Sequence, residues 1–181
     1  MKILLINNNT IHLPKLSNSL AGHELEAVEY MPGIKLDSSN KDLVILSGGG
    51  GEGREATDRH SGGDLWYKDE IEFILQSQTP ILGICMGFEL ICHAYGSPVE
   101  KLSNSVIGLR DVKLPSGSKL KQFESHDWGI LSVPSKELEV VADSETGIEI
   151  VKHRTRPLLG TQFHPELGGS LELQRLILSV V

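Results

Sequence analysis

The sequence predicts an α/β protein with one domain, built on a doubly wound, mostly parallel sheet that carries a small antiparallel side sheet. Strand-like runs at residues 3–6, 42–46 and 81–84 are almost wholly apolar. Such runs indicate central strands of a parallel sheet, which are buried on both faces and lack polar alternation. Runs with alternating polarity in the second half of the chain indicate antiparallel strands. The 181 residues suit a single domain spanning 1–181.

Strand and helix patterns alternate through the first half of the chain. In order, they are a strand at 3–6, a short helix at 13–20 broken by Pro14, a strand at 25–30, a strand at 42–46, and a helix marked by Leu65, Ile71, Ile74 and Leu75. The asparagines at 7–9 follow the first strand, at the edge where open α/β sheets bind ligands. Turn formation is the simpler interpretation of these asparagines.

The second half of the chain changes to short strand patterns. They are runs at 99–102, 106–109 and 112–114 separated by turn residues, strands at 138–142 and 148–151, a strand at 158–163, and a closing helix marked by Leu171, Leu173, Leu176, Ile177 and Val180.

Composition excludes several classes of function. The formal net charge is −7 and no basic stripe is visible, which argues against nucleic acid as a partner. No stretch approaches the roughly 20 apolar residues of a membrane span, and no signal peptide is visible, so we expect a cytoplasmic protein without membrane contact. Cys85 and Cys92 are spaced about two helical turns apart, too far for a disulfide. No pattern predicts a metal or another cofactor.

The stretch from Pro80 to Ile91 indicates a nucleophile at a sharp turn. An apolar strand leads directly into Cys85, with Gly83 two residues before it and Gly87 two residues after it, and a helical pattern follows. The nucleophile elbow of serine hydrolases has the same arrangement, because side chains beside such a turn would clash. A helix that starts beside the sulfur is expected to lower the thiol pKa. The alternative is a buried, inert cysteine.

A candidate base and its orienting group follow the strand at 158–163. His164 and Glu166 are two residues apart, and in an extended segment such residues point the same way. A thiol nucleophile requires a base, and the base requires a group that fixes its tautomer and orientation. Cys85, His164 and Glu166 therefore form a candidate catalytic triad.

Three motifs in this order resemble those of the class I, or triad-type, glutamine amidotransferases. They are Leu46-Ser47-Gly48-Gly49, Gly83-Ile84-Cys85-Met86-Gly87 and Thr161-Gln162-Phe163-His164-Pro165-Glu166. The resemblance covers most of the chain and implies a flavodoxin-like sheet. It also implies a glutaminase reaction through a γ-glutamyl thioester on Cys85, with His164 as base and Glu166 as its orienting group.

The resemblance extends to the substrate site. It implies an oxyanion hole formed by the N–H groups of Gly49 and Met86, in a loop where Gly50 replaces the family's usual proline. It further implies substrate contacts from Gly48, Glu89, Ser125 and His126. A structural role for His126 stays open, and its neighbour Asp127 is poorly placed to orient it, since adjacent strand residues face opposite ways.

One residue departs from the family pattern and leaves the substrate open. Glu89 stands where most members have a glutamine that contacts the substrate, and the related γ-glutamyl hydrolases have Gly-Phe-Glu at the same place. A γ-glutamyl peptide hydrolase acting alone is therefore one alternative, and a non-catalytic regulatory subunit on the same fold is another. The overall layout is more similar to the small glutaminase subunits that serve a synthetase, as in GMP synthetase. That resemblance implies a separate synthase subunit that receives the ammonia.

Overall fold

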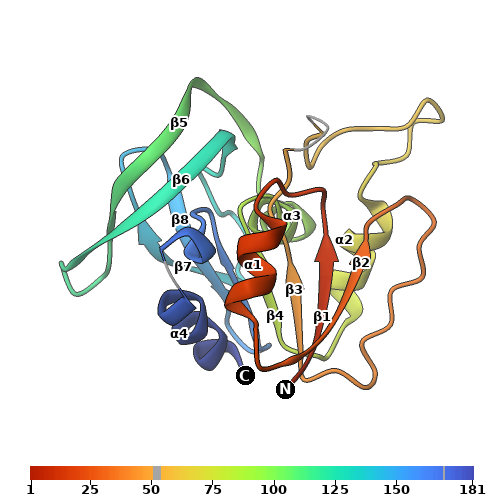
Figure 1. Ribbon diagram of the computed structural model, residues 1–181. Coiled ribbons are helices and arrows are strands. Elements are labelled where there is room, and N and C mark those ends of the chain that lie inside the picture. The colour runs from red at the N-terminus through yellow and green to blue at the C-terminus, as the bar shows by residue number, and fades with distance from the viewer. Residues whose placement is uncertain (51–53, 169) are drawn as a thin grey trace.

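A computed structural model describes residues 1–50, 54–168 and 170–181 of the chain (Figure 1). The strands are β1 (Lys2–Asn7), β2 (Glu24–Glu29), β3 (Leu43–Leu46), β4 (Ile81–Ile84), β5 (Glu100–Lys113), β6 (Lys119–Gly129), β7 (Leu138–Asp143), β8 (Ile148–His153) and β9 (Leu158–Thr161). The helices are α1 (Leu13–Ser19), α2 (Lys68–Gln76), α3 (Met86–Ala94) and α4 (Ser170–Val180), with a short 3₁₀ helix, η1 (Pro165–Leu167), before α4.

The described strands form one nine-stranded sheet in the order β2-β1-β3-β4-β9-β8-β7-β5-β6. Neighbouring strands from β2 to β9 are parallel, and those from β9 to β6 are antiparallel. The parallel part has the 2-1-3-4-5 order of flavodoxin-like folds, as the sequence predicted. The predicted antiparallel side sheet continues the main sheet, and its β5–β6 ribbon joins β7 through the single pair Lys113–Asp143.

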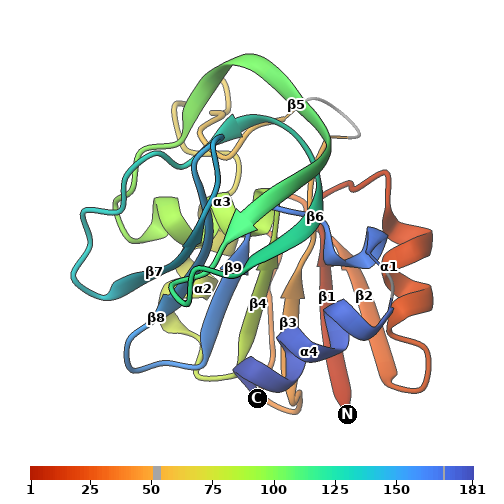
Figure 2. The same ribbon diagram turned by 90° about the vertical axis from the view of Figure 1, so that its left-hand side faces the viewer.

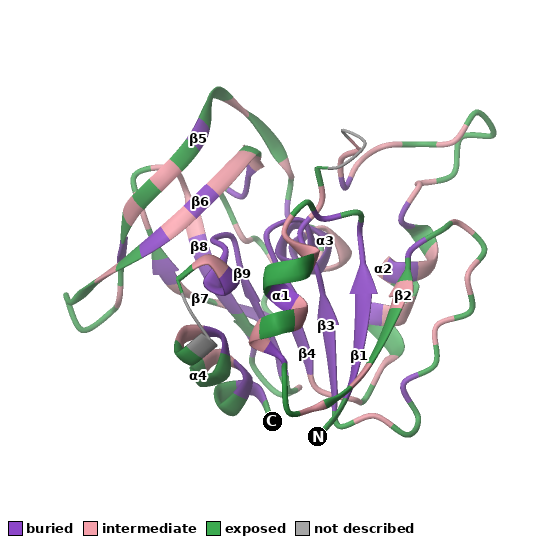
Figure 3. Cartoon of the chain, viewed as in Figure 1, coloured by how far each residue is buried: buried purple, intermediate pink, exposed green. Residues whose placement is uncertain are grey.

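The helices cover the parallel strands on both faces. Alternate residues of each central strand face opposite ways, so β1 sends Leu4 and Ile6 to the face covered by α2 and α3, and Ile3 and Leu5 to the face covered by α1 and α4. Figure 3 shows β1, β3 and β4 buried along nearly their whole length. Within the described residues, no helix is long and apolar enough to span a membrane.

Two details differ from the sequence prediction. Pro14 does not break α1, because it lies in the first helical turn, where its missing N–H is not needed for a helix hydrogen bond. The three separate runs predicted between 99 and 114 are one strand, β5, whose pairing with β6 shifts in register between Lys101 and Val106. The polar residues between these two positions, which the sequence pattern indicated as a turn, lie in this irregular part of the strand.

The start of α3 is packed unusually close to the sheet. A Cβ atom added to Gly83 would lie 2.6 Å from the carbonyl oxygen of Gly87, and one added to Gly87 would lie 2.4 Å from the carbonyl oxygen of Leu46. Both obstacles are backbone atoms, which cannot move aside as a flexible side chain can. The two glycines around Cys85 therefore let the helix begin directly against β3 and β4.

We predict that Gly87→Ala lowers the free energy of unfolding by about 1–3 kcal/mol or more, because the new methyl group overlaps the Leu46 backbone. Denaturant unfolding followed by circular dichroism measures this change. Gly62→Ala is the matched control, since nothing lies within 4 Å of the added Cβ there. Equal stability of the two variants would contradict the close packing described above.

Candidate active site

Cys85 lies at the turn between β4 and α3 in a strained backbone conformation. Its φ is 51° and its ψ is −105°, in the left-handed half of conformational space that residues with a Cβ rarely adopt. The Cys85 N–H donates to the carbonyl of Thr161 at 2.8 Å, and the Glu89 N–H donates to the Cys85 carbonyl at 3.0 Å. These bonds tie the turn to β9 and to the first turn of α3. The thiol is thereby held at the carboxyl edge of the sheet.

A buried histidine–glutamate pair lies on the next strand. His164 follows β9, the neighbour of β4, and Glu166 lies in the 3₁₀ helix η1 that comes next. The Nδ1 atom of His164 lies 2.8 Å from Oε1 of Glu166, and both side chains are almost fully buried. With the carboxylate accepting from Nδ1–H, the neutral imidazole keeps Nε2 free to accept a proton.

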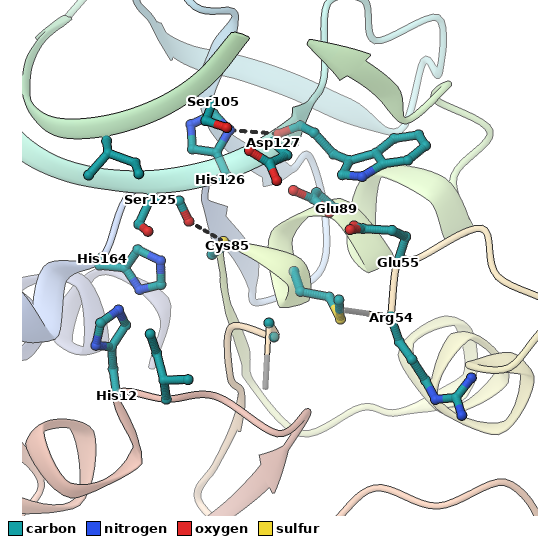
Figure 4. A pocket seen from close by; sticks show the side chains of 16 residues that line it. His12, Arg54, Glu55, Cys85, Glu89, Ser105, Ser125, His126, Asp127 and His164 are labelled. Atoms are coloured by element: carbon teal, nitrogen blue, oxygen red, sulfur yellow. Dashed lines mark hydrogen bonds between the residues drawn. The ribbon is translucent and has the colours of Figure 1, made fainter. Parts of the chain in front are cut away.

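The thiol and the imidazole face each other across Gly48. A Cβ added to Gly48 would lie 3.0 Å from Cε1 of His164 and 3.4 Å from Cβ of Cys85, so a larger residue would separate them. Figure 4 shows Cys85 and His164 facing one cavity. The sulfur is within hydrogen-bond range of two other groups: it donates to the Ser125 carbonyl at 3.9 Å and accepts from Nε2 of Gln162 at 3.9 Å. The structure thus brings together the three residues predicted as a triad.

The cavity above the thiol has a volume of about 300 Å³. Figure 4 shows Glu55, Glu89 and Asp127 on one side of it and His12 and His164 on the other, while His126 lies beside Asp127. His12 was not predicted, because a single histidine before a short helix carries no sequence signal. Its ring meets that of His164 edge to face, with centroids 4.9 Å apart. Burial first, and then the neighbouring His164, lowers the pKa of His12.

The predicted oxyanion residues lie side by side next to the sulfur. A Cβ added to Gly49 would lie 2.4 Å from the Cε atom of Met86, so the loop after β3 contacts the first residue of α3. Burial raises the pKa of the Cys85 thiol, and a hydrogen bond from the Met86 N–H opposes this effect in part. Gly49 and Met86 both line the cavity.

The expected low thiol pKa is wrong for this arrangement. Burial, and then the nearby carboxylates of Glu89 and Glu166, raise the pKa of Cys85 well above its ordinary value and outweigh the Met86 N–H. The start of α3 lies beside the sulfur as expected, but it cannot offset the loss of water and the added negative charge. This direction of the pKa shift disfavours a free thiolate and calls for a base that takes the proton when the sulfur attacks.

Glu89 is a buried acid in direct reach of the site. Its Oε1 atom accepts from Nε2 of Gln162 at 3.0 Å, and this is the same nitrogen that donates to the sulfur. Burial raises the pKa of Glu89 to about 7, partly offset by the Gln162 hydrogen bond. The side chain therefore changes charge near neutral pH. It is 3% exposed and lines the wall of the cavity. Gln162 was not predicted as a site residue, although it belongs to the motif that contains His164.

Strand β6 forms one wall of the cavity and contributes the predicted pair Ser125 and His126 to its lining. The His126 ring lies 2.6 Å from the Trp128 carbonyl through Nδ1 and 3.2 Å from Oε2 of Glu124 through Nε2. Burial lowers the pKa of His126, but these two hydrogen bonds outweigh it, and the net shift is upward. An imidazolium that donates from both nitrogens has no free position to accept a proton, which disfavours His126 as the base.

The same strand also contacts the histidine of the predicted triad. The His164 N–H donates to the carbonyl of Phe123 at 2.8 Å, and Ser125, two residues further along β6, accepts from the Cys85 thiol. One strand therefore contacts both the Cys85 thiol and the His164 backbone. Among the described residues, no group of three or more His, Cys, Asp or Glu side chains is arranged to hold a metal ion.

A strained cysteine at a strand–helix turn, beside a buried histidine–glutamate pair, is typical of enzymes that cleave acyl bonds through a thiol nucleophile. Comparison with known proteins gives a narrower class. The family model described as glutamine amidotransferase class-I matches residues 15–179. The chain belongs to the class I glutamine amidotransferase family.

Several proteins similar to this chain are described as glutamine-hydrolyzing subunits of GMP synthase. Over 179 residues the chain is 29% identical to the glutamine-hydrolyzing GMP synthase subunit of Methanocaldococcus jannaschii, with 92% of this chain and 88% of the relative covered. The corresponding subunit from Methanococcus maripaludis is 31% identical, with the same coverage. Among solved structures, a candidate GMP synthase subunit from Thermoplasma acidophilum has a TM-score of 0.80 at 23% identity, covering 99% of this chain and 93% of that one. The last likeness establishes the fold alone.

We predict that Glu89→Gln lowers the pKa of the Cys85 thiol, because it removes a negative charge that raises it. The rate of alkylation by iodoacetamide as a function of pH reports this pKa, and the midpoint should move to lower pH. Glu100→Gln, at an exposed position on β5, is the control and should leave the midpoint in place. A midpoint that does not move in Glu89→Gln would show that the carboxylate does not act on the sulfur.

Proposed function

We propose that this protein hydrolyses the γ-amide of glutamine and supplies ammonia to a separate synthase subunit. The observation that carries the proposal is the thiol of Cys85 beside the His164–Glu166 pair, in a cavity that adjoins two backbone segments suited to bind an oxyanion. The family membership and the names of the similar proteins support the same reaction and the same kind of partner. The cytoplasmic location expected from the sequence is part of this proposal.

The proposed reaction begins with attack on the amide carbon. As the sulfur of Cys85 bonds to this carbon, its proton passes to Nε2 of His164, and the negative charge on the carbonyl oxygen lies between the N–H groups of Gly49 and Met86. Glu166 holds the imidazole in the tautomer that can accept the proton and stabilises the imidazolium that forms.

The thioester is then formed and hydrolysed by the same groups. His164 gives its proton to the leaving nitrogen, the C–N bond breaks, and ammonia departs, leaving a γ-glutamyl thioester on Cys85. Water, deprotonated by His164, attacks this thioester and releases glutamate, and the thiol regains its proton. The chain's own residues account for each proton transfer without a cofactor.

The acid-lined side of the cavity is proposed to hold the amino-acid end of the substrate. Glu89 and Asp127 line this side, together with the backbone of Ser125, and all three face the cavity that contains the thiol. A carboxylate at this side complements the α-ammonium group of glutamine. It equally complements a γ-glutamyl peptide, which is the one observation that favours a hydrolase as a second candidate. The assembled triad disfavours a purely regulatory subunit.

We predict that Cys85→Ala reduces glutamate release from glutamine by at least about 1,000-fold, because no other group can form the thioester. Release is measured with the chain alone and with an extract of its source organism that supplies the partner subunit. Cys92→Ala is the matched control, since Cys92 is a buried thiol on the same helix without a role in the reaction. Activity retained in Cys85→Ala would contradict the thiol mechanism.

The two candidate substrates are separated by comparing glutamine with a panel of γ-glutamyl dipeptides. We expect glutamine to be the better substrate of the wild-type chain, and Glu89→Gln to shift kcat/KM further toward free glutamine. Dipeptides cleaved well above glutamine would establish the stand-alone hydrolase instead. An unchanged preference in Glu89→Gln would remove Glu89 from the substrate contacts.

A further inference from the structure

Another buried acid lies behind the site, and it does not line the cavity that contains the thiol. Glu70, on α2, is 0% exposed, and its Oε1 atom accepts from Nδ2 of Asn8 at 3.0 Å. Asn8 is in the polar loop after β1 and is itself 3% exposed. The two residues are 62 positions apart in the chain. Their contact connects α2 to the edge of the sheet where the site lies.

The unpaired atoms of these two side chains indicate that Glu70 is protonated. Oε2 of Glu70 and Oδ1 of Asn8 are both buried without a hydrogen-bond partner among the described residues. If the acid were ionised, both atoms would be acceptors with nothing to accept. A protonated Glu70 donates from one oxygen while it accepts on the other, and a carboxylic acid and an amide pair in this reciprocal way through two hydrogen bonds.

The surroundings of Glu70 favour the neutral acid. Burial raises the pKa of Glu70 to about 8, and the hydrogen bond from Asn8 offsets part of this shift. The titratable groups that Glu70 acts on electrostatically are Tyr30, just after β2, and Tyr67, just before α2. Burial raises the pKa of both tyrosines, and nearby acids add to this effect: Asp69 and Glu70 for Tyr30, and Glu70 for Tyr67, where Arg54 opposes it. Burial is therefore the dominant influence on the charge of this acid.

Asn8 in turn holds the loop that carries the proposed oxyanion donor. The Asn8 N–H donates to Oγ of Ser47 at 2.8 Å, and its Nδ2 atom lies 3.4 Å from the Ser47 carbonyl. Oγ of Ser47 donates to the Gly48 carbonyl at 2.8 Å, and the Ser47 carbonyl accepts from the Gly87 N–H at 3.2 Å. Ser47 is thus held between Asn8 and the start of α3, immediately before Gly48 and Gly49.

We propose that Glu70 is a positioning residue for amide hydrolysis, acting as a neutral carboxylic acid whose two hydrogen bonds with Asn8 hold Ser47 and orient the Gly48–Gly49 backbone beside the thiol. Glu70 does not touch the substrate or the sulfur. The effect on catalysis rests on the proposed function, because it acts through the proposed oxyanion donor at Gly49. The acid–amide pair itself stands on the contacts of Glu70 and Asn8 alone.

The first test compares the kinetics of Glu70→Leu and Glu70→Gln. Glu70→Leu leaves Asn8 without its partner, and kcat for glutamine should fall by about 10- to 100-fold, less than the loss of a whole oxyanion donor, with KM nearly unchanged. Glu70→Gln restores both hydrogen bonds, since its amide donates to Oδ1 and accepts from Nδ2 of Asn8, and should recover kcat at neutral pH. Wild-type kcat in Glu70→Leu would overturn the positioning role.

The pH dependence separates positioning from mere structural support. As pH rises through about 8, Glu70 ionises, its bond to Oδ1 of Asn8 is lost, and wild-type kcat should fall. Glu70→Gln cannot ionise and should lack this alkaline decrease. Glu72→Gln, an exposed acid on the same helix, is the matched control and should follow the wild type. An identical alkaline limb in Glu70→Gln and wild type would overturn the proposal.

A second test uses stability and needs no activity. Because the folded-state pKa of about 8 exceeds the ordinary value of 4.5, the wild-type contribution of Glu70 is fully present below about 4.5 and is lost as pH rises to about 8. The unfolding equilibrium constant of wild type relative to Glu70→Gln should therefore rise by up to about tenfold per pH unit in this window. A ratio that does not change with pH would overturn the protonated pair.

These tests distinguish failure of the inference from failure of the proposed function. Absence of glutamine hydrolysis by the wild-type chain, alone and with its partner, would overturn the proposed function and the catalytic effect of Glu70 together. The unfolding comparison would still decide whether Glu70 and Asn8 form the acid–amide pair.

Discussion

The close contact between the first turn of α3 and the two strands beneath it determines the geometry of the whole site. Gly83 and Gly87 remove the side chains that would hold the helix away from the sheet, and the chain between them is forced through the left-handed conformation of Cys85. The strain at this one residue is supported by the buried strands on either side and by the bond from Cys85 N–H to Thr161. The position of the sulfur, the Met86 N–H and the loop after β3 all follow from that contact.

Several buried acids lie near this contact, and the side chain of each accepts a hydrogen bond that offsets part of the cost of its burial. Glu166 is held against an imidazole, Glu89 against the amide of Gln162, and Glu70 against the amide of Asn8. The partners of Glu89 and Glu70 are neutral amides, and burial raises the pKa of these two acids to about 7 and about 8. Both acids can therefore change charge near neutral pH without breaking an ion pair to lysine or arginine at these contacts.

The sequence predicted the parallel core and the three motif residues because both depend on local patterns. Buried parallel strands are apolar without alternation, and glycines two residues either side of Cys85 mark a helix start that packs too close to the sheet for side chains. The predicted lowering of the thiol pKa was wrong, because this pKa is raised by burial and by carboxylates that only the fold brings close. The contact of Glu70 with Asn8 and the ring of His12 beside His164 were equally invisible, since they join segments far apart in the chain. The prediction for Pro14 was wrong because the effect of a proline depends on whether it lies in the first helical turn or later.

The β5–β6 ribbon curls over the carboxyl edge of the sheet and lies above the site (Figures 1 and 2). It is joined to β7 by the single pair Lys113–Asp143, while β6 holds the His164 backbone through Phe123 and the Cys85 thiol through Ser125. Because both contacts belong to one strand, a shift of β6 would change the surroundings of the Cys85 thiol and of the His164 backbone together.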